Sequence, residues 1–312
     1  MERLETKLVE SIVDLIPSET LHLLTPLDSK WGRIASKRLN SYICCKAVFV
    51  FSGQKCRMMA SRCSVLSGEI APWDKFADLD ADEIAQTTVN QIVLSGNLND
   101  PPSIQVCPFA YERNLTDPIF RDRLVNFLGQ CRLATNAEIR VDEVHPEIGR
   151  ILVNGIRSGF QRAVFRKCHF DIGGFLERLL KENTLATVMI SHSQAHSYLP
   201  LLLKNRPRRL NHAIFEESSI EVRFIRELLS WWNQTEPVPQ PLRVRFISSD
   251  IYRLQNFFQN NPAAKRYYNQ PAEGVIYLIE HVVEMKRGRP NYAMVHVRRS
   301  EIEIKLTNIP GL

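Results

Sequence analysis

The sequence lacks any long hydrophobic run. Its longest apolar stretches, such as residues 47–51, have the length of a β-strand, whereas a helix that crosses a membrane needs about 20 apolar residues. Residues 1–5 carry acidic side chains where a secretory signal would have an apolar core. We therefore expect no membrane span and no export signal. A protein of this kind is expected in a reducing compartment, the cytoplasm or the nucleus.

The sequence also lacks the motifs of common enzyme classes. It has no Gly-x-Ser-x-Gly motif, no phosphate loop of the Walker type and no repeated acidic metal motif. Four cysteines lie close together in the sequence, at Cys44, Cys45, Cys56 and Cys63. Their spacing matches no usual set of zinc ligands, and no glutamate follows His192 in the pair His192 and His196. We expect no catalytic residue, no metal and no cofactor, and therefore no enzyme.

The composition is that of an ordinary globular protein. The 312 residues are 44% hydrophobic and 24% charged, which excludes a disordered or collagen-like chain. A chain of this length buries about three quarters of its unfolded surface, so it can fold without disulfides. The formal net charge is +6, which permits contact with nucleic acid or acidic lipid without requiring it.

From residue 137 onward, strand-like runs alternate with helix-like runs, which predicts an α/β fold. The strand-like runs are residues 138–142, 163–166, 187–190, 212–215 and 243–246. The helix-like runs, whose apolar residues recur every three or four positions, are residues 148–156, 175–180, 198–203 and 222–229. Beyond residue 250 we expect a carboxy-terminal cap, residues 251–312. It would hold a helix at 252–259, a strand or helix at 275–283, and a hairpin of 292–297 with 301–306.

The strand-like runs recur at a nearly constant period. Their first apolar residues are Ile139, Ala163, Val188, Ala213 and Val244, which are 24, 25, 25 and 31 residues apart. A period of this size is typical of a repeat solenoid, and the proline-rich residues 236–241 account for the longer last step. Ile92 fits the same pattern if residues 99–118 are an insertion. The repeats predict adjacent parallel strands with helices on one side, and an ordinary doubly wound α/β domain is the alternative.

Each strand pattern reads apolar-x-apolar-x-x-(small or polar), which resembles the strand segment of a leucine-rich repeat. Asn97 and Cys168 occupy the family's Asn/Cys position, while Ser193 and Ser218 depart from it. A small hydrogen-bonding side chain is needed there to satisfy backbone groups where the strand ends. The resemblance implies a strand-helix solenoid with a curved parallel sheet over residues 44–250.

Residues 1–43 are helical in periodicity and form a separate module. The apolar stripes comprise Leu8, Ile12, Leu15 and Ile16; Leu21, Leu24 and Leu27; and Trp31, Ile34, Ala35 and Leu39. The stretch resembles an F-box, the helical module that docks a substrate receptor onto the Skp-type adaptor of a cullin ubiquitin ligase. In the matching register Leu4-Glu5 replaces the family's Leu-Pro, Glu19 is the acidic turn residue, and Trp31 is the tryptophan. From the residues alone, an amphipathic cap on the first strand is the alternative.

The F-box resemblance implies an adaptor-binding surface formed by Leu4, Leu8, Ile12, Ile16, Leu24, Leu27 and Trp31. The predicted target-binding residues point outward from the strands and comprise Arg140, Asp142, Arg166, Lys167, Met189, His192, Ile214, Glu216, Glu217 and Arg245. Their mixed charge and apolar members suit a protein partner better than a phosphate backbone. Basic clusters at residues 206–209, 286–289 and 298–299 keep an RNA-binding solenoid as an alternative.

The order of the two parts is that of an F-box protein with a degenerate leucine-rich-repeat-like region, similar to the nematode-type F-box/FTH-like proteins. The resemblance implies a non-catalytic substrate receptor of a cullin-type ubiquitin ligase. Its partners would be a Skp-type adaptor, the cullin subunits and an unknown protein target. A repeat scaffold without a ligase connection remains the alternative.

Overall fold

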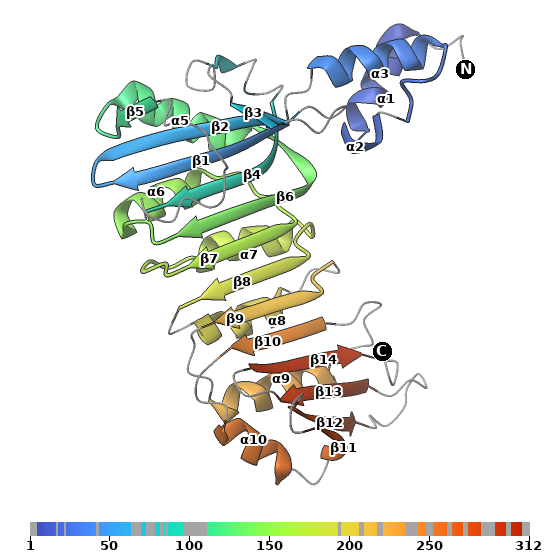
Figure 1. Ribbon diagram of the computed structural model, residues 1–312, viewed down its shortest axis with the longest axis vertical. Coiled ribbons are helices and arrows are strands. Elements are labelled where there is room, and N and C mark those ends of the chain that lie inside the picture. The colour runs from blue at the N-terminus through green and yellow to red at the C-terminus, as the bar shows by residue number, and fades with distance from the viewer. Residues whose placement is uncertain are drawn as a thin grey trace. The chain divides into compact units, whose positions relative to one another are not determined.

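The computed structural model of the chain is shown in Figure 1. It describes residues 5–16, 18–21, 23–41, 44–63, 70–72, 79–81, 84, 87–96, 111–192, 195–205, 209–216, 221–234, 242–247, 252–260, 264–270, 274–281, 291–297 and 301–307. The chain forms two compact units, Met1–Phe160 and Gln161–Leu312. Their boundary lies inside the region 44–250 in which the sequence predicts repeats.

The first unit begins with a cluster of helices: α1 (Thr6–Leu15), α2 (Ser18–Leu21) and α3 (Lys30–Ser41). Its core contains Val9 and Val13 of α1, Leu21 of α2 and Ala35 of α3, all fully buried. The buried side of α1 is the stripe with Val9 and Val13, whereas Leu8 of the apolar stripe noted in the sequence is 48% exposed. Both stripes repeat every four residues, and only the packing of α1 against α3 decides between them.

The sheet of the first unit mixes parallel and antiparallel pairing. Its strands are β1 (Cys44–Ser52), β2 (Lys55–Cys63), β3 (Ile70–Pro72), β4 (Thr88–Ser95), β5 (Tyr111–Asn114) and β6 (Arg132–Asp142). The order is β3-β2-β1-β4-β6, with β5 beside β2. The strands β1, β4 and β6 are parallel, whereas β2 pairs antiparallel with β1, β3 and β5. The prediction of an all-parallel sheet from residue 44 is therefore wrong at this edge, where Gly53, at φ 58°, closes the β1–β2 hairpin.

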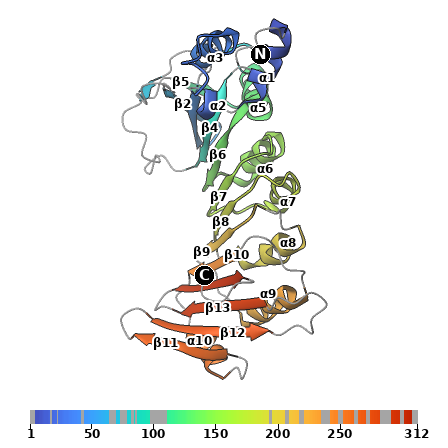
Figure 2. The ribbon, with the colours of Figure 1, turned by 90° about the vertical axis from the view of Figure 1, so that its right-hand side faces the viewer.

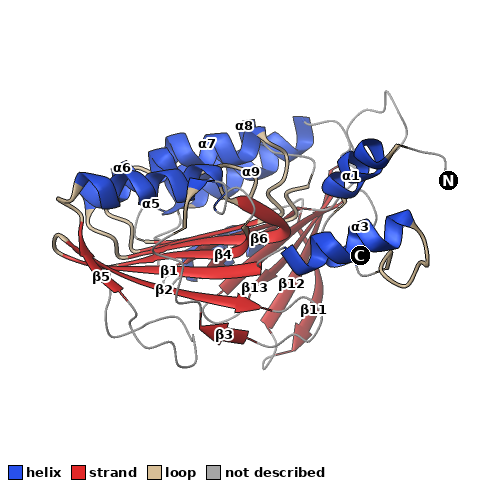
Figure 3. Ribbon diagram, turned by 90° about the horizontal axis from the view of Figure 1, so that it is seen from above, coloured by secondary structure: helices blue, strands red, loops and turns tan. Residues whose placement is uncertain are grey.

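Two helices cover one face of this sheet: α5 (Pro118–Gln130) and α6 (Pro146–Gly155) (Figure 3). The start of α5 is set locally, because the Asp117 carboxylate accepts hydrogen bonds from the backbone N–H groups of Ile119 and Phe120, and Pro118 occupies a position where no N–H is needed. The strand β5 and the start of α5 fall within the predicted insertion 99–118. Residues 97–110 lie outside the described part of the chain.

The second unit has a parallel half and an antiparallel half. The parallel strands are β7 (Arg162–Arg166), β8 (Thr187–Ser191), β9 (His212–Glu216) and β10 (Leu242–Ile247). The antiparallel strands are β11 (Ala264–Gln270), β12 (Gly274–His281), β13 (Asn291–Val297) and β14 (Glu301–Thr307), in the order β10-β14-β13-β12-β11. The predicted hairpin 292–297 with 301–306 is confirmed as β13 and β14, and residues 275–283 contribute the strand β12. The strand β11 was not predicted.

The helical elements of this unit are α7 (Gly173–Lys181), η2 (Ala195–Tyr198), α8 (Leu199–Lys204), α9 (Val222–Gln234) and α10 (Tyr252–Gln259). The predicted helices agree with α7, α8, α9 and α10. Figure 2 shows α7, α8 and α9 on one side of the parallel strands, which does not fit a doubly wound sheet with helices on both faces. Within the part of the chain that the structure describes, no helix is long and apolar enough to cross a membrane.

Within each unit the strand register aligns the residues from which the period was counted. Ala163 pairs with Val188, Val188 with Ala213, and Ala213 with Val244. In the first unit Ile92 pairs with Ile139. These side chains are at most 2% exposed, so each period of the sequence adds one member to a buried layer on the helix-covered face. The chain is therefore an α/β protein with a mixed sheet.

The same backbone hydrogen bond occurs just beyond the carboxyl ends of two strands, β4 and β7. The N–H of Gly96, after β4, donates to the carbonyl of Asp142 in β6 over 2.8 Å. At the equivalent position the N–H of Lys167, after β7, donates to the carbonyl of Ser191 in β8 over 2.7 Å. One residue beyond Lys167, the buried Cys168 thiol lies 3.6 Å from the Arg166 carbonyl. This is the hydrogen-bonding role that the sequence pattern predicts for a small side chain at this position.

Gly96 tests how tightly this junction is packed. A Cβ atom on Gly96 would lie 2.2 Å from the carbonyl oxygen of Glu143, so we expect Gly96→Ala to lower the free energy of unfolding by about 1–3 kcal/mol. The matched control is Gly174→Ala in α7, where the added Cβ would meet nothing within 4 Å; it should be neutral or stabilising by up to about 1 kcal/mol. Urea denaturation measures both. Equal stabilities of Gly96→Ala and the wild type would contradict the close packing.

Candidate protein-docking surfaces

The first candidate surface lies on the amino-terminal helices. Three leucines of this cluster are largely exposed: Leu8 at 48%, Leu23 at 65% and Leu27 at 48%. Leu8 lies on α1, and the other two lie in the turn between α2 and α3. Isolated exposed leucines are common on protein surfaces, but three within one small helical cluster make that cluster a candidate for protein contact.

The predicted adaptor-binding residues divide into two groups. Leu8 and Leu27 are exposed and Ile12 is half-buried. Ile16, Leu24 and Trp31 pack against the buried core of the helical cluster. Leu4 lies outside the described residues. Leu23 was missed, because it falls between the helical stripes and in a turn, and its exposure becomes evident only from the structure.

The turn that carries Leu23 and Leu27 is held tightly against α3. The Ser29 hydroxyl accepts a hydrogen bond from the Gly32 N–H over 3.4 Å, which caps the first turn of α3. A Cβ on Gly32 would lie 1.9 Å from the Leu27 carbonyl oxygen, so only glycine permits this approach. Leu27 is therefore presented from a fixed backbone. The Trp31 indole Nε1 is buried and finds no acceptor among the described residues.

The second candidate surface is the side of the second unit's sheet opposite α7, α8 and α9, which we call the open face. Its side chains form three rows across the strands, because the register aligns every second residue. The first row comprises Arg162, Thr187, His212, Arg243, Lys305 and Met294. The second row comprises Val164, Met189, Ile214, Arg245, Glu303 and His296. The third row comprises Arg166, Ser191, Glu216, Ile247 and Glu301.

The predicted target-binding residues are less accessible than their outward orientation suggests. Met189 is only 7% exposed, while Arg166, Ile214 and Glu216 are half-buried and Lys167 is exposed. His192 is half-buried beyond the end of β8, and Glu217 lies outside the described residues. The expectation of an exposed apolar contact at Met189 is therefore wrong, because neighbouring side chains already shield it from water.

Three of the predicted charges are engaged within the chain. In the first unit Arg140 forms an ion pair with Asp142, and Asp142 is only 7% exposed. In the second unit Arg245 forms an ion pair with Glu301 at 2.5 Å. Ion pairs of this kind satisfy partly buried charges and remove them from the set that a partner can contact.

Sequence reasoning missed the most basic part of the open face, its first row. Arg162, His212 and Arg243 occupy equivalent positions at the starts of β7, β9 and β10, and Lys305 follows on β14. Each of the first three comes one residue before the apolar residue from which the repeats were counted. Extending the period-two alternation by one residue would have found them, whereas Lys305 depends on the pairing of β14 with β10.

His212 shows how close these charges are to one another. Burial lowers its pKa below the ordinary value of 6.5; Glu303 raises it, and Arg243, Arg245 and Arg162 lower it further. The Nε2 atom of His212 is buried and has no hydrogen-bond partner among the described residues. Burial therefore keeps His212 mainly neutral at pH 7, and the charges near it are those of Glu303 and three arginines.

A third cluster lies beyond the carboxyl end of β8. The Tyr198 hydroxyl lies 3.3 Å from an Asp171 carboxylate oxygen, and the His192 and Tyr198 rings meet edge to face at 5.9 Å. His196 instead packs against the Phe224 ring at 4.5 Å. The two histidines therefore have different neighbours and do not form a ligand pair. Within the described residues, no group of three or more His, Cys, Asp or Glu side chains could hold a metal ion.

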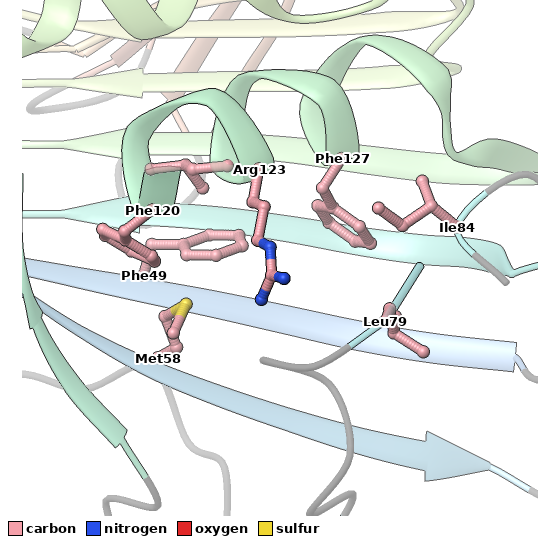
Figure 4. A pocket seen from close by; sticks show the side chains of 8 residues that line it. Phe49, Met58, Leu79, Ile84, Phe120, Arg123 and Phe127 are labelled. Atoms are coloured by element: carbon pink, nitrogen blue, oxygen red, sulfur yellow. The ribbon is translucent and has the colours of Figure 1, made fainter. Parts of the chain in front are cut away.

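The first unit contains a shallow pocket between α5 and the sheet (Figure 4). Its empty space is about 330 Å³, including its open mouth. Phe49, Phe120 and Phe127 line it together with Met58 and aliphatic side chains, and Arg123 is the single charged side chain among the described lining residues. Phe49 and Phe127 are in ring contact at 6.0 Å. The lining residues that the structure describes include no nucleophile, acid or base that could carry a reaction, and we interpret the pocket as a gap in the packing of α5 on the sheet.

The described cysteines have the character of core residues. Cys45, Cys56, Cys131 and Cys168 are buried and form no disulfide. Burial raises the pKa of Cys131 to about 12 and raises that of Cys56 strongly, so these thiols stay protonated and unreactive at neutral pH.

Comparison with known protein families, curated proteins and solved structures finds no match to this chain. The described residues thus define an α/β protein whose candidate sites are surfaces.

The three half-buried histidines make the stability depend on pH. Burial lowers the pKa values of His192, His196 and His212 below 6.5 in the folded protein. Below that pH the unfolded chain binds more protons than the folded one, so the stability is full above pH 6.5 and falls as the pH drops through the folded pKa values. We expect the thermal midpoint to fall between pH 7.5 and pH 5.5, and to fall less in the triple His→Gln variant.

The control for this measurement is His145→Gln, which replaces an exposed histidine. It should show the same loss of thermal midpoint on acidification as the wild type. If the triple variant also loses as much as the wild type, carboxylates and not these histidines govern the pH response.

Proposed function

We propose that this protein is a non-catalytic substrate receptor of a cullin-type ubiquitin ligase. Its amino-terminal helices would bind a Skp-type adaptor, and its sheet would bind the protein to be ubiquitinated. The observation that carries the proposal is the amino-terminal cluster, which has its own buried core and yet exposes Leu8, Leu23 and Leu27. Its resemblance to an F-box supplies the chemical class of the partner.

In the helical cluster, the residues that form the core differ from the exposed residues that a partner could contact. Val9, Val13, Leu21 and Ala35 hold α1, α2 and α3 together. A module that only capped the strands would have no need to expose Leu8 and Leu27. Exposed leucines on a rigid scaffold can instead be buried by a partner, and because they are 48–65% exposed, each would contribute about half to two thirds of the roughly 1.5–3 kcal/mol of a fully exposed side chain.

Trp31 acts mainly through the fold of this cluster. Its side chain packs against the core of α1, α2 and α3, so truncating it creates a cavity and disturbs the surface indirectly. Trp31 is therefore a poor choice for separating adaptor binding from folding.

The sheet suits the role of a target-binding surface. The open face presents side chains from rigid, paired strands and carries both signs of charge, which favours orientation of a protein partner. A scaffold without a ligase connection would use the same face, so the adaptor decides between the two functions. Partner subunits would supply the chemistry of ubiquitin transfer.

The decisive test is binding to a purified Skp-type adaptor, measured by calorimetry with the wild type and with Leu8→Glu/Leu27→Glu. Because both leucines are exposed, the double variant should keep the wild-type thermal midpoint. Two charges in an apolar interface should weaken binding by at least about 100-fold. The matched control is Ile119→Glu/Ile151→Glu, which alters two exposed apolar residues of α5 and α6.

The control should bind the adaptor as tightly as the wild type. If the wild type does not bind the adaptor, the proposed ligase function is wrong, and the hypothesis of a scaffold without a ligase connection replaces it. If both double variants lose binding equally, the interface is not on the helical cluster.

A further inference from the structure

The first row of the open face concentrates positive charge on one line. Its cations are Arg162 of β7, Arg243 of β10 and Lys305 of β14, and the uncharged Thr187 of β8 and the mainly neutral His212 of β9 lie between Arg162 and Arg243. The structure shows no ion pair for Arg243 or Lys305 among the described residues. The acidic residues of this face belong to the other two rows.

We propose that this row, which we call the basic row, binds an acidic extended segment of a protein partner that runs across the strands. The proposal deepens the proposed function, because it names the chemistry of the target that the open face would accept. None of these residues belongs to the target-binding set expected from the sequence.

The spacing of the basic row matches an extended chain. Adjacent strands are about 4.8 Å apart, so Arg162 and Arg243, three strands apart, are separated by about 14 Å at their backbones. In an extended peptide alternate side chains recur every 6.6 Å or so, and three successive carboxylates on one side therefore span about 13 Å. A segment of the type Glu-x-Glu-x-Glu thus spans the distance from Arg162 to Arg243. A small, compact anion would need several cations that converge on one point. The cations of a row do not converge, so the row favours an extended ligand.

The surroundings of the row determine the kind of binding. The neighbouring aliphatic residues Val164 and Met189 are only 3% and 7% exposed, so they offer a partner little further apolar contact. They do exclude water from one side of the cations, which strengthens charge interactions there. Binding should therefore be mostly electrostatic and should weaken as salt is added.

The same surroundings disfavour a nucleic acid. Among the described side chains of the three rows there is no Phe, Tyr or Trp on which bases could stack, and single-stranded RNA is usually held by such stacking. An acidic peptide needs no stacking platform.

The test is fluorescence anisotropy with the full chain and two labelled peptides. One contains three glutamates that alternate with serines, and its twin contains glutamine at the same positions. We expect the glutamate peptide to bind at least about tenfold more tightly than the glutamine peptide at about 50 mM salt, and this preference to shrink at about 300 mM. Equal binding of the two peptides, or binding of neither, would overturn the proposal.

A matched pair of variants locates the site. Arg162→Gln/Arg243→Gln removes two charges of the basic row, whereas Lys181→Gln/Lys204→Gln removes two exposed charges from α7 and α8 on the other side of the sheet. The first variant should lose the preference for the glutamate peptide, and the second should keep it. Unchanged binding by the first variant would contradict the assignment, provided that both variants keep the wild-type thermal midpoint.

Two further measurements separate this proposal from its rivals. A labelled oligouridylate that binds more tightly than the glutamate peptide, and loses binding in Arg162→Gln/Arg243→Gln, would make the row a nucleic-acid site and overturn the proposal. Adaptor binding is measured on the same protein samples. A protein that binds the glutamate peptide but not the adaptor would uphold the basic row while refuting the ligase function.

Discussion

The structure depends on the in-register pairing of strands that follow one another at a fixed sequence period. In the second unit this pairing aligns Ala163, Val188, Ala213 and Val244 into one buried layer. Two residues further along each strand, a second layer contains Phe215 and Phe246, whose rings stack at 5.3 Å. A slip of one residue in any strand would turn these side chains to the other face and expose them. The hydrophobic burial of both layers therefore fixes the register.

The same register determines the surface that faces away from the helices. Because side chains alternate along a strand, fixing the buried layers also fixes which residues stand in line on the open face. Charges that are far apart in the sequence, such as Arg162 and Lys305, thereby come to share one row. Exposed members of a row, such as Arg162 and Arg243, can change with little effect on stability, whereas its buried members cannot. A sheet of this kind offers a rigid surface whose specificity is set independently of its core.

The sequence allowed prediction of the features that depend on local pattern. The strand-helix alternation, the pairing of Ile92 with Ile139, and the β13–β14 hairpin are all confirmed, because period and turn positions are local properties. Features that depend on long-range packing were not predictable in this way. The choice of Val9 and Val13 over Leu8 as the buried side of α1 requires contact with α3. Likewise, the pairing of β2 with β5 joins residues on either side of a long intervening segment, and a period count provides no signal for it.

The candidate sites show the same limit for a physical reason. Because successive side chains of a strand point to opposite faces of the sheet, the outward direction of Met189 and Arg245 was predictable from the sequence. Accessibility depends on what the neighbours cover, and Met189 turned out to be shielded while Arg245 is engaged by Glu301. Lys305 reaches the basic row only because β14 pairs antiparallel with β10. A docking surface on a sheet is thus a property of the strand order, and the carboxy-terminal strands that extend this sheet also supply part of its charge.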